Sequence, residues 1–313
     1  MSMLPEYPST LRKLILGPLA GVYAVSSILH RKLWLRPTLP LPVLPLIVIG
    51  SLRAGGAGKT AVTLELARYL RAQGKRVGIL TYRMRGPRPW GEIEVTPQSD
   101  WRDSSDEAVL LARVSGARVF ATRDRATTWR RLGKTGSFDV LLADDGLMDS
   151  RLGNTRLSGA FRIALVRPGE NPGVVDLLPA GPYRLTVAAL KSMDYVLEFS
   201  REIVLPDKFD FKKTYWVLSG MGNPTAFRAD LQAAGVQVAG LSTGPNHGLP
   251  NLPKARREAH MAGTGGVLFT AKDGVKLADR LQPADNGFEI GERVPFSTGF
   301  LSAIDVFLAP PSS

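Results

Sequence analysis

The residues with the most recognisable chemistry are three glycines followed at once by a lysine and a threonine, in the stretch PLIVIGSLRAGGAGKT. Glycines let successive backbone N–H groups turn toward one anion, because a Cβ would block both the turn and the close approach. In such a loop the lysine reaches the β- and γ-phosphates of a nucleotide, and the threonine hydroxyl holds Mg²⁺. The predicted nucleotide-binding residues are Gly55, Gly56, Ala57, Gly58, Lys59 and Thr60.

The elements around this loop have the order that a phosphate loop requires. Residues 46–49 form a short apolar run typical of a buried strand, and residues 61–73 have helix-forming composition with apolar residues on one face. The dipole of that helix would add to an anion site at its N-terminus. Arg53 stands where the strict motif has its first glycine, so a glycine-rich turn before an ordinary helix is the alternative. The order of strand, glycines, Lys-Thr and helix favours the phosphate loop.

A pair of acids follows another predicted strand. Residues 138–143 read FDVLLA, and Asp144 and Asp145 come directly after them. A carboxylate at the tip of an apolar strand downstream of a phosphate loop is where a magnesium-coordinating acid is expected. The alternative is a polar strand end before a turn. We interpret Asp144, Asp145 and the Thr60 hydroxyl as the candidate magnesium ligands.

Two further residues have weaker contexts on their own. Asp106 opens an apolar helical run after Ser105, where acids commonly interact with the helix dipole. His247 lies in a loop, TGPNHG, where a lone histidine is most often a surface residue. The chain has three histidines and no cysteine, which excludes disulfides, thiolate zinc sites and a cysteine nucleophile.

The charge balance favours an anionic partner. Forty basic and 28 acidic residues give a formal charge of +12, and nucleic acid, an acidic membrane surface or a phosphorylated substrate would each suit it. No nucleic-acid-binding motif is present, and the basic residues are not interleaved with aromatic ones. We therefore expect no nucleic acid and predict no protein partner.

The first residues contain an uncharged apolar run, 14–29, with basic clusters on both sides. It is slightly shorter than the roughly 20 residues that span a bilayer. A short membrane-inserted helix, an interfacial helix and a buried core helix are the alternatives, and the flanking basic residues favour membrane association. Proline-rich residues 37–45 then predict an extended linker.

Strands and helices alternate through the remaining chain and predict an α/β fold. We expect a mostly parallel sheet of the phosphate-loop NTPase kind, flanked by helices, with a smaller C-terminal α/β subdomain. The expected division is residues 1–36 as an N-terminal membrane-associated helix, 37–190 as a kinase domain and 191–313 as the smaller domain.

Several short motifs together resemble the tetraacyldisaccharide 4′-kinase family, the lipid A kinases of Gram-negative bacteria. They recur in the family's order over most of the chain and are IVIGSLRAGGAGKT, SDEAVLLAR with TRDR, LLADDGL, LLPAGPYR, GMGNPTAF, the Asn246-His247 loop and FTAKDGVKL. The order of so many motifs is more specific than any single one.

The resemblance implies an enzyme of the inner membrane whose active site faces the cytoplasm. Its substrates would be ATP with Mg²⁺ and the glycolipid tetraacyldisaccharide 1-phosphate, whose 4′-hydroxyl it would phosphorylate to give lipid IVA. Asp106 matches the family's base and His247 the histidine that pairs with it, while Lys59 would stabilise the transferred phosphate. A kinase for a different glycolipid, or a nucleotide-binding homologue without kinase activity, are the alternatives.

Overall fold

The computed structural model describes residues 9–33, 44–55, 58–82, 91–149, 152, 159–198, 200–207, 209–220, 224–244, 248, 250–277 and 279–310, with side chains of the first helix only from 13 to 29. The helices are α1 Ser9–Leu33, α2 Lys59–Ala72, α3 Asp106–Ser115, α4 Arg125–Gly133, α5 Pro224–Ala233, α6 Leu252–Met261, α7 Ala271–Leu277 and α8 Thr298–Leu308. The strands are β1 Leu46–Ser51, β2 Val77–Tyr82, β3 Ile93–Val95, β4 Arg118–Thr122, β5 Val140–Ala143, β6 Ala160–Val166, β7 Tyr195–Glu198, β8 Glu202–Val204, β9 Thr214–Ser219, β10 Gln237–Thr243, β11 Val267–Thr270 and β12 Gly287–Arg293.

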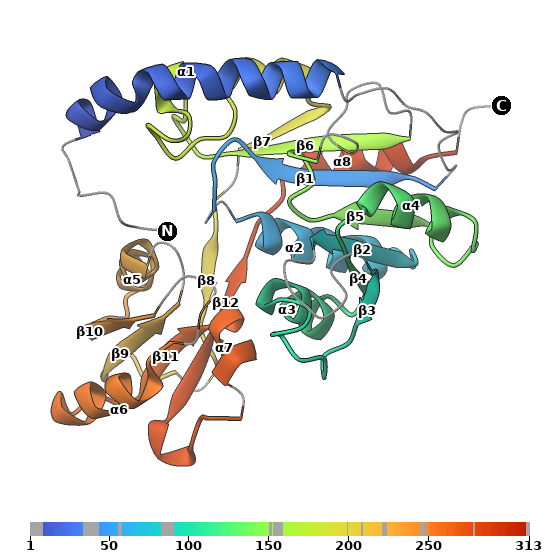
Figure 1. Cartoon of the computed structure of the whole chain (residues 1–313). Helices are drawn as coiled ribbons and strands as arrows, with labels where there is room; N and C mark the ends of the chain where they lie inside the picture. The colour runs from blue at the N-terminus through green and yellow to red at the C-terminus, as the bar shows by residue number, and fades with distance from the viewer. Residues whose placement is uncertain are drawn as a thin grey trace.

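Within these residues the first sheet has seven strands in the order β3-β4-β2-β5-β1-β6-β7. All neighbours are parallel except β3, which pairs antiparallel with β4 at one edge. The strand β1 lies between β5 and β6, so the chain segments that follow β1 and β5 leave the same edge of the sheet side by side. This arrangement brings the phosphate-loop segment beside the acid pair (Figure 1).

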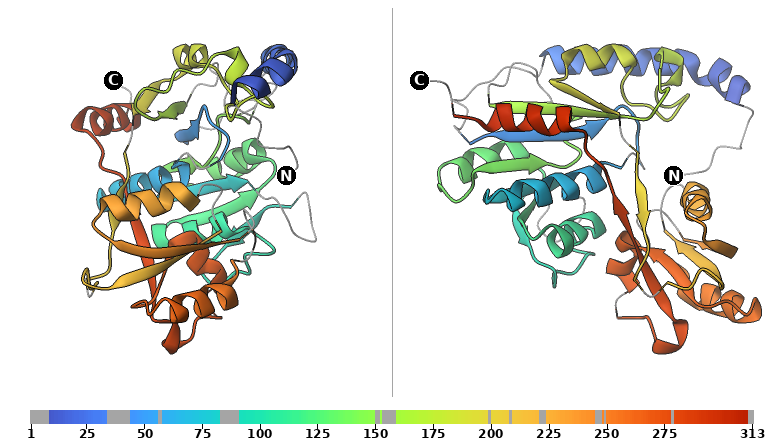
Figure 2. Two further views of the ribbon diagram at one scale, coloured as in Figure 1. Left: turned by 90° about the vertical axis from the view of Figure 1, so that its left-hand side faces the viewer. Right: turned by 180° about the vertical axis from the view of Figure 1, so that it is seen from behind.

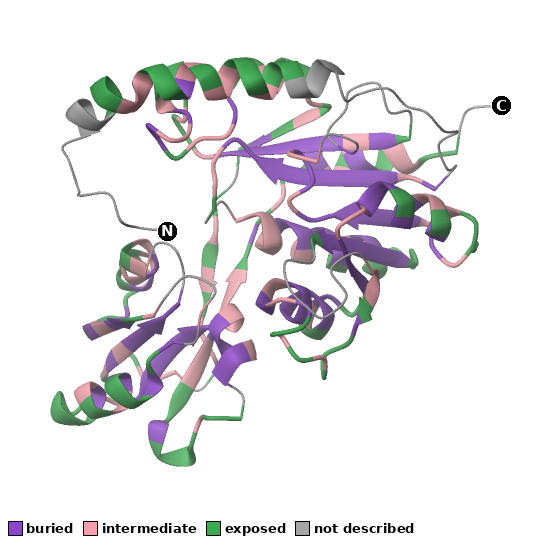
Figure 3. Ribbon diagram, in the orientation of Figure 1, coloured by how far each residue is buried: buried purple, intermediate pink, exposed green. Residues whose placement is uncertain are grey.

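Both faces of this sheet are covered, which explains why its central strands read as continuous apolar runs. Ile47 and Ile49 of β1 face a core shared with α2, α3 and α8. Leu46 and Val48 point to the opposite face and share a core with α4, whose Trp129 is 1% exposed. Figure 3 shows the central strands of this sheet as mainly buried.

The second sheet has five strands in the described chain, in the order β10-β9-β11-β12-β8, and only β8 pairs antiparallel. The α5 helix shares one core with it through Phe227 and Leu231, and α6 shares another through Leu252 and Ala255. The chain therefore contains two α/β units, and the predicted α/β fold with a large, mostly parallel sheet is confirmed.

The chain crosses between the units twice. It leaves the first sheet after β7, forms the second sheet, and returns after β12 to α8, which packs on the first sheet (Figure 2). The rings of Phe300 and Tyr195 lie 5.1 Å apart, as do those of Phe307 and Phe161. Because β7 and α8 contact the first sheet, we propose that residues 195–198 and 298–308 belong structurally to the larger unit.

The N-terminal helix α1 packs on the loop 176–185, the LLPAGPYR region, through Ala20 against Leu177 and Ala180. Lys13 forms an ion pair with Asp176 at 2.5 Å. Much of the helix's remaining surface is apolar and exposed (Figure 3). No helix in the part of the chain that is described has both the length and the apolar character needed to cross a membrane.

Candidate active site

The phosphate-loop segment and the acid pair meet at the carboxyl edge of the first sheet. Leu46 pairs with Leu141 and Val48 with Ala143, so β1 and β5 run in register toward this edge. The loop that follows β1 therefore lies beside Asp144 and Asp145. Sites in α/β proteins characteristically lie outside the carboxyl ends of the strands, at such a point.

The described part of the loop has the backbone conformation that requires glycine. Gly55 has φ of 68° and Gly58 has φ of 73°, both in the left-handed region. Lys59 is the first residue of α2, so the N–H groups of the first helical turn face the loop. Gly56 and Ala57 lie outside the described residues.

The first acid is buried and the second is half-exposed. The Thr63 hydroxyl oxygen lies 3.0 Å from an Asp144 carboxyl oxygen and 3.0 Å from the Lys59 carbonyl oxygen, and both oxygens share its single hydrogen as acceptors. Burial, and after it the negative charges of Glu107 and Asp145, raise the pKa of Asp144 to about 7, although the Thr63 hydrogen bond and the charge of Lys59 oppose the rise. Carboxylates gathered in this way favour a bound cation.

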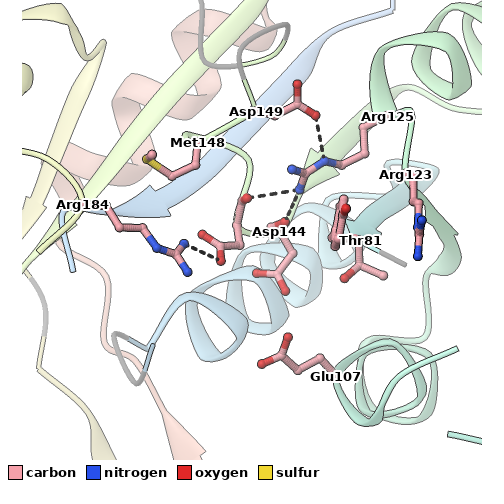
Figure 4. A pocket seen from close by; sticks show the side chains of 10 residues that line it. Thr81, Glu107, Arg123, Arg125, Asp144, Met148, Asp149 and Arg184 are labelled. Carbon is pink, nitrogen blue, oxygen red and sulfur yellow. Dashed lines mark hydrogen bonds and ion pairs between the residues drawn. The ribbon is translucent and has the colours of Figure 1, made fainter. Parts of the chain in front are cut away.

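The carboxylate of Asp145 lies between two cations. One of its oxygens, Oδ2, is 3.4 Å from the Lys59 ammonium. The same oxygen is 3.4 Å from the Arg184 guanidinium (Figure 4). Its backbone has φ of 50°, an uncommon value for a residue with a side chain. Arg184 comes from the LLPAGPYR loop, so a third segment of the chain reaches the acid pair.

A buried arginine holds the backbone of the acid pair. Arg125, at the start of α4, is 4% exposed and donates to the carbonyl oxygens of Asp144 at 2.8 Å and Asp145 at 3.2 Å. Its Nε is 3.3 Å from the Asp149 carboxylate. These contacts fix the turn that follows β5 and so fix the direction of both carboxylates.

These groups line a cavity of about 500 Å³ (Figure 4). Four acids contribute to its wall: Glu107, Asp144, Asp145 and Asp149. Three arginines contribute opposite charge: Arg123, Arg125 and Arg184. Such a mixed lining fits a ligand that carries both phosphates and a metal cation.

Asp106 lies next to the cavity but is not part of its described lining. Ser105 caps α3 by accepting from the Ala108 N–H at 3.1 Å, and the two acids of the first turn then diverge. Glu107 lines the cavity, whereas Asp106 is 3% exposed and its Oδ2 lies 2.7 Å from the Lys276 ammonium. His247 lies outside the described residues.

The acids suit a metal that takes few protein ligands. No three His, Cys, Asp or Glu side chains of the described chain gather into a metal-binding group. Mg²⁺ is usually held by one or two carboxylates together with water and substrate phosphates, so an acid pair beside a phosphate loop fits it. Thr60 follows Lys59 in the first turn of α2, within the same corner of the site.

Several site residues were not predicted from the sequence. Arg125, Arg184 and Glu107 lie within the motifs TRDR, LLPAGPYR and SDEAVLLAR, but the sequence assigns none of them a role in the site. Lys272 and Lys276 contact Asp106 and Glu107. The sequence could have indicated that these two lysines act together, because residues four apart lie on one face of a helix.

Comparisons with known proteins agree with this architecture. The family described as tetraacyldisaccharide-1-P 4′-kinase matches residues 12–215. The tetraacyldisaccharide 4′-kinase of Halorhodospira halophila is 32% identical over 84% of this chain and 84% of its own length. The one from Acidovorax ebreus is 32% identical over 96% of this chain and 92% of its own.

A solved structure has the same fold. The crystal structure of LpxK from Aquifex aeolicus in complex with ATP superposes with a TM-score of 0.68, at 22% identity, over 95% of this chain and 99% of that one.

Proposed function

Because this chain belongs to the tetraacyldisaccharide-1-P 4′-kinase family, we propose that it transfers the γ-phosphate of ATP to the 4′-hydroxyl of tetraacyldisaccharide 1-phosphate. The product is lipid IVA, so the enzyme acts in lipid A biosynthesis. The single observation that supports this activity best is the ion pair of 3.4 Å between Lys59 and Asp145, because Asp145 lines a cavity of about 500 Å³.

The nucleotide is proposed to bind in the phosphate loop. The N–H groups from Gly55 to Thr60 would surround the phosphates, with Gly56 and Ala57 completing the loop. Lys59, now paired with Asp145, would turn to the transferred phosphate when the nucleotide enters. Its side chain is 10% exposed, so the charge that it offers acts in a poorly hydrated site, where it is worth more than in water.

Thr60, Asp144 and Asp145 are the proposed magnesium ligands. Mg²⁺ supplies charge neutralisation on the phosphates during phosphoryl transfer. The residues of this chain fit that role because the buried acid and its half-exposed neighbour present oxygens beside the loop. Arg125 holds their backbone, so the protein fixes the ligands before any nucleotide binds.

Acceptor activation is assigned to the acidic pair of α3. Asp106 is the proposed base for the proton of the 4′-hydroxyl, with His247 as its partner, and a positioned carboxylate typically contributes about 10²- to 10⁴-fold. Glu107 lies in the cavity wall beside it. Asp106→Asn and Glu107→Gln, assayed separately, distinguish the two acids: the larger loss of turnover identifies the base.

The transfer assay itself uses detergent-solubilised protein, γ-labelled ATP, Mg²⁺ and tetraacyldisaccharide 1-phosphate. Labelled lipid is expected from the wild type and not from Lys59→Met. A panel of other glycolipid acceptors tests the acceptor class in the same format. Labelling of another acceptor in preference to the tetraacyldisaccharide would show that the acceptor is different.

We also propose that the protein works at the cytoplasmic face of the bacterial inner membrane and binds it through α1. The side chains of Leu14, Val22 and Val25 on this helix are 76%, 66% and 66% exposed. Apolar side chains on a surface helix flanked by basic residues suit the boundary between headgroups and acyl chains.

Co-sedimentation with anionic liposomes tests this placement. The double variant Val22→Asp, Val25→Asp should lose most of its liposome binding. Val306→Asp is the control, because Val306 is even more exposed than Val22 and Val25, at 76%, but lies on α8. Equal binding by the double variant and the control would exclude α1 as the membrane contact.

A further inference from the structure

The two acids that open α3 are both held by lysines from the other α/β unit. Lys276 of α7 lies 2.7 Å from the Asp106 carboxylate, and Lys272 of the same helix lies 2.7 Å from Glu107. Lys272 is also 3.9 Å from Asp106. The two helices lie side by side across the boundary between the units (Figure 1).

The sequence of α7 explains how both lysines reach α3. Thr270 and Asp273 cap the helix reciprocally: the Thr270 hydroxyl donates to the Asp273 carboxylate at 2.9 Å and accepts from its N–H at 3.2 Å. Asp273 also accepts from the Gly220 N–H at 3.1 Å, which ties the helix to the end of β9. With the helix fixed, side chains four residues apart extend from one face toward the acids.

Because the Lys276–Asp106 ion pair is buried, removing either partner should be costly in free energy. The Lys276 side chain is 0% exposed and that of Asp106 is 4% exposed, so neither charge has water to stabilise it if the other is removed. Other charged groups near Asp106 in the described chain include Lys272, Glu107 beside it on α3, and Asp273, which interacts with both lysines.

The second lysine stays a cation in this setting. Burial lowers the pKa of Lys272, but the negative charges of Glu107 and Asp106 outweigh burial and the net shift is upward. Two ammonium groups beside a buried carboxylate favour its ionised form, which is the form that can accept a proton. Its direction is also fixed, since the lysines anchor both side chains.

We propose that Lys276 and Lys272 are positioning residues: together they hold the Asp106 carboxylate ionised, and they orient the acidic pair Asp106–Glu107 for acceptor activation. The proposal rests on the proposed kinase function and deepens it. It also makes the charge of the base depend on the packing of α7 against α3, so the second unit contributes to the site through these two lysines.

The test compares pH profiles of kcat/KM for the wild type and Lys276→Met, which keeps the length of the side chain and removes its charge. The acidic limb of the profile should move to higher pH by about one to three units, the usual effect of a neighbouring opposite charge on a carboxylate. Arg113→Met is the control, because its ion pair with Glu289 at 2.8 Å also joins α3 to the second unit. That control should leave the limb in place.

A second measurement does not depend on activity. The difference in denaturation midpoint between wild type and Lys276→Met should be largest near neutral pH and should shrink on acidification. The reason is that the variant can bury the Asp106 carboxyl with little penalty only after it has bound a proton. A difference that stays constant with pH would overturn the proposal, as would an unmoved acidic limb.

If Lys276→Met does not fold, Lys272→Met decides, since that side chain is 20% exposed and tolerates truncation better. A smaller shift of the limb in the same direction supports the proposal, and no shift overturns it. Absence of labelled lipid from the wild type would instead refute the proposed function, and the stability comparison would still decide the role of the lysines.

Discussion

The burial of Asp144 predicts a specific effect on stability. This carboxyl group is 3% exposed, and burial, followed by the charges of Glu107 and Asp145, raises its pKa to about 7. In the unfolded chain an aspartate has a pKa of about 3.9. Between these values the folded protein binds a proton that the unfolded chain does not bind. The free energy of unfolding therefore falls as the pH rises through this window, and it levels off above it.

The magnitude follows from the shift. Each pH unit within the window lowers the free energy of unfolding by about 1.4 kcal/mol, so raising the pH from about 5.5 to about 8 removes about 2 kcal/mol through this one group. Asp144→Asn keeps the volume and an oxygen acceptor for Thr63 but does not titrate. The free energy of unfolding of the variant should therefore rise by about 2 kcal/mol relative to that of the wild type over the same change of pH.

The assay is guanidinium chloride denaturation of nucleotide-free protein in EDTA, at both pH values, for wild type and Asp144→Asn. Asp100→Asn, an exposed acid at the surface, is the control and should show no such dependence. Addition of Mg²⁺ with ATP should reduce the pH-dependent difference in free energy of unfolding between Asp144→Asn and wild type, because a bound cation offsets the buried negative charge. If wild type and Asp144→Asn differ in free energy of unfolding by the same amount at both pH values, the reasoning about Asp144 is refuted.

Two further substitutions test the packing of the site. Arg125→Met removes a buried guanidinium from Asp149 and from two main-chain carbonyls, and it should lower the free energy of unfolding by about 3 kcal/mol. The control is Arg102→Met, because the Arg102 side chain is 55% exposed. This control should change the free energy of unfolding by less than about 0.5 kcal/mol in the same denaturation series. Gly50→Ala should destabilise by about 1–3 kcal/mol, because a Cβ there would lie 2.6 Å from the Leu147 side chain. An unchanged thermal midpoint for Gly50→Ala would contradict that contact.

Much of the site could be predicted from the sequence because its parts lie at strand ends. A parallel sheet aligns the carboxyl ends of neighbouring strands, so the loop after β1 and the acids after β5 meet once the two strands pair. The acid pair directly follows one apolar run, and the glycines and Lys59 follow another after a short segment. Local pattern and sheet geometry are therefore sufficient to bring these groups together.

The partners of the acids on α3 could not be predicted in the same way. Asp106 reads locally as a first-turn residue, and its ion pair with Lys276 exists only because α7 of the second unit packs on α3. The return of α8 to the first sheet is also a tertiary feature, since nothing in its apolar pattern indicates which of the two sheets it covers. Arg125 likewise reads as a solvated arginine until the turn after β5 closes over it.

Phosphoryl transfer to the lipid is the measurement that tests the central claim most directly. Wild-type protein is incubated with γ-labelled ATP, Mg²⁺ and tetraacyldisaccharide 1-phosphate, and the position of the new phosphate on the purified product is determined by NMR. The account predicts label on the 4′-oxygen, loss of that label in Lys59→Met, and retention of it in Arg113→Met. Wild-type protein that binds ATP and yields no 4′-phosphorylated lipid would contradict the account.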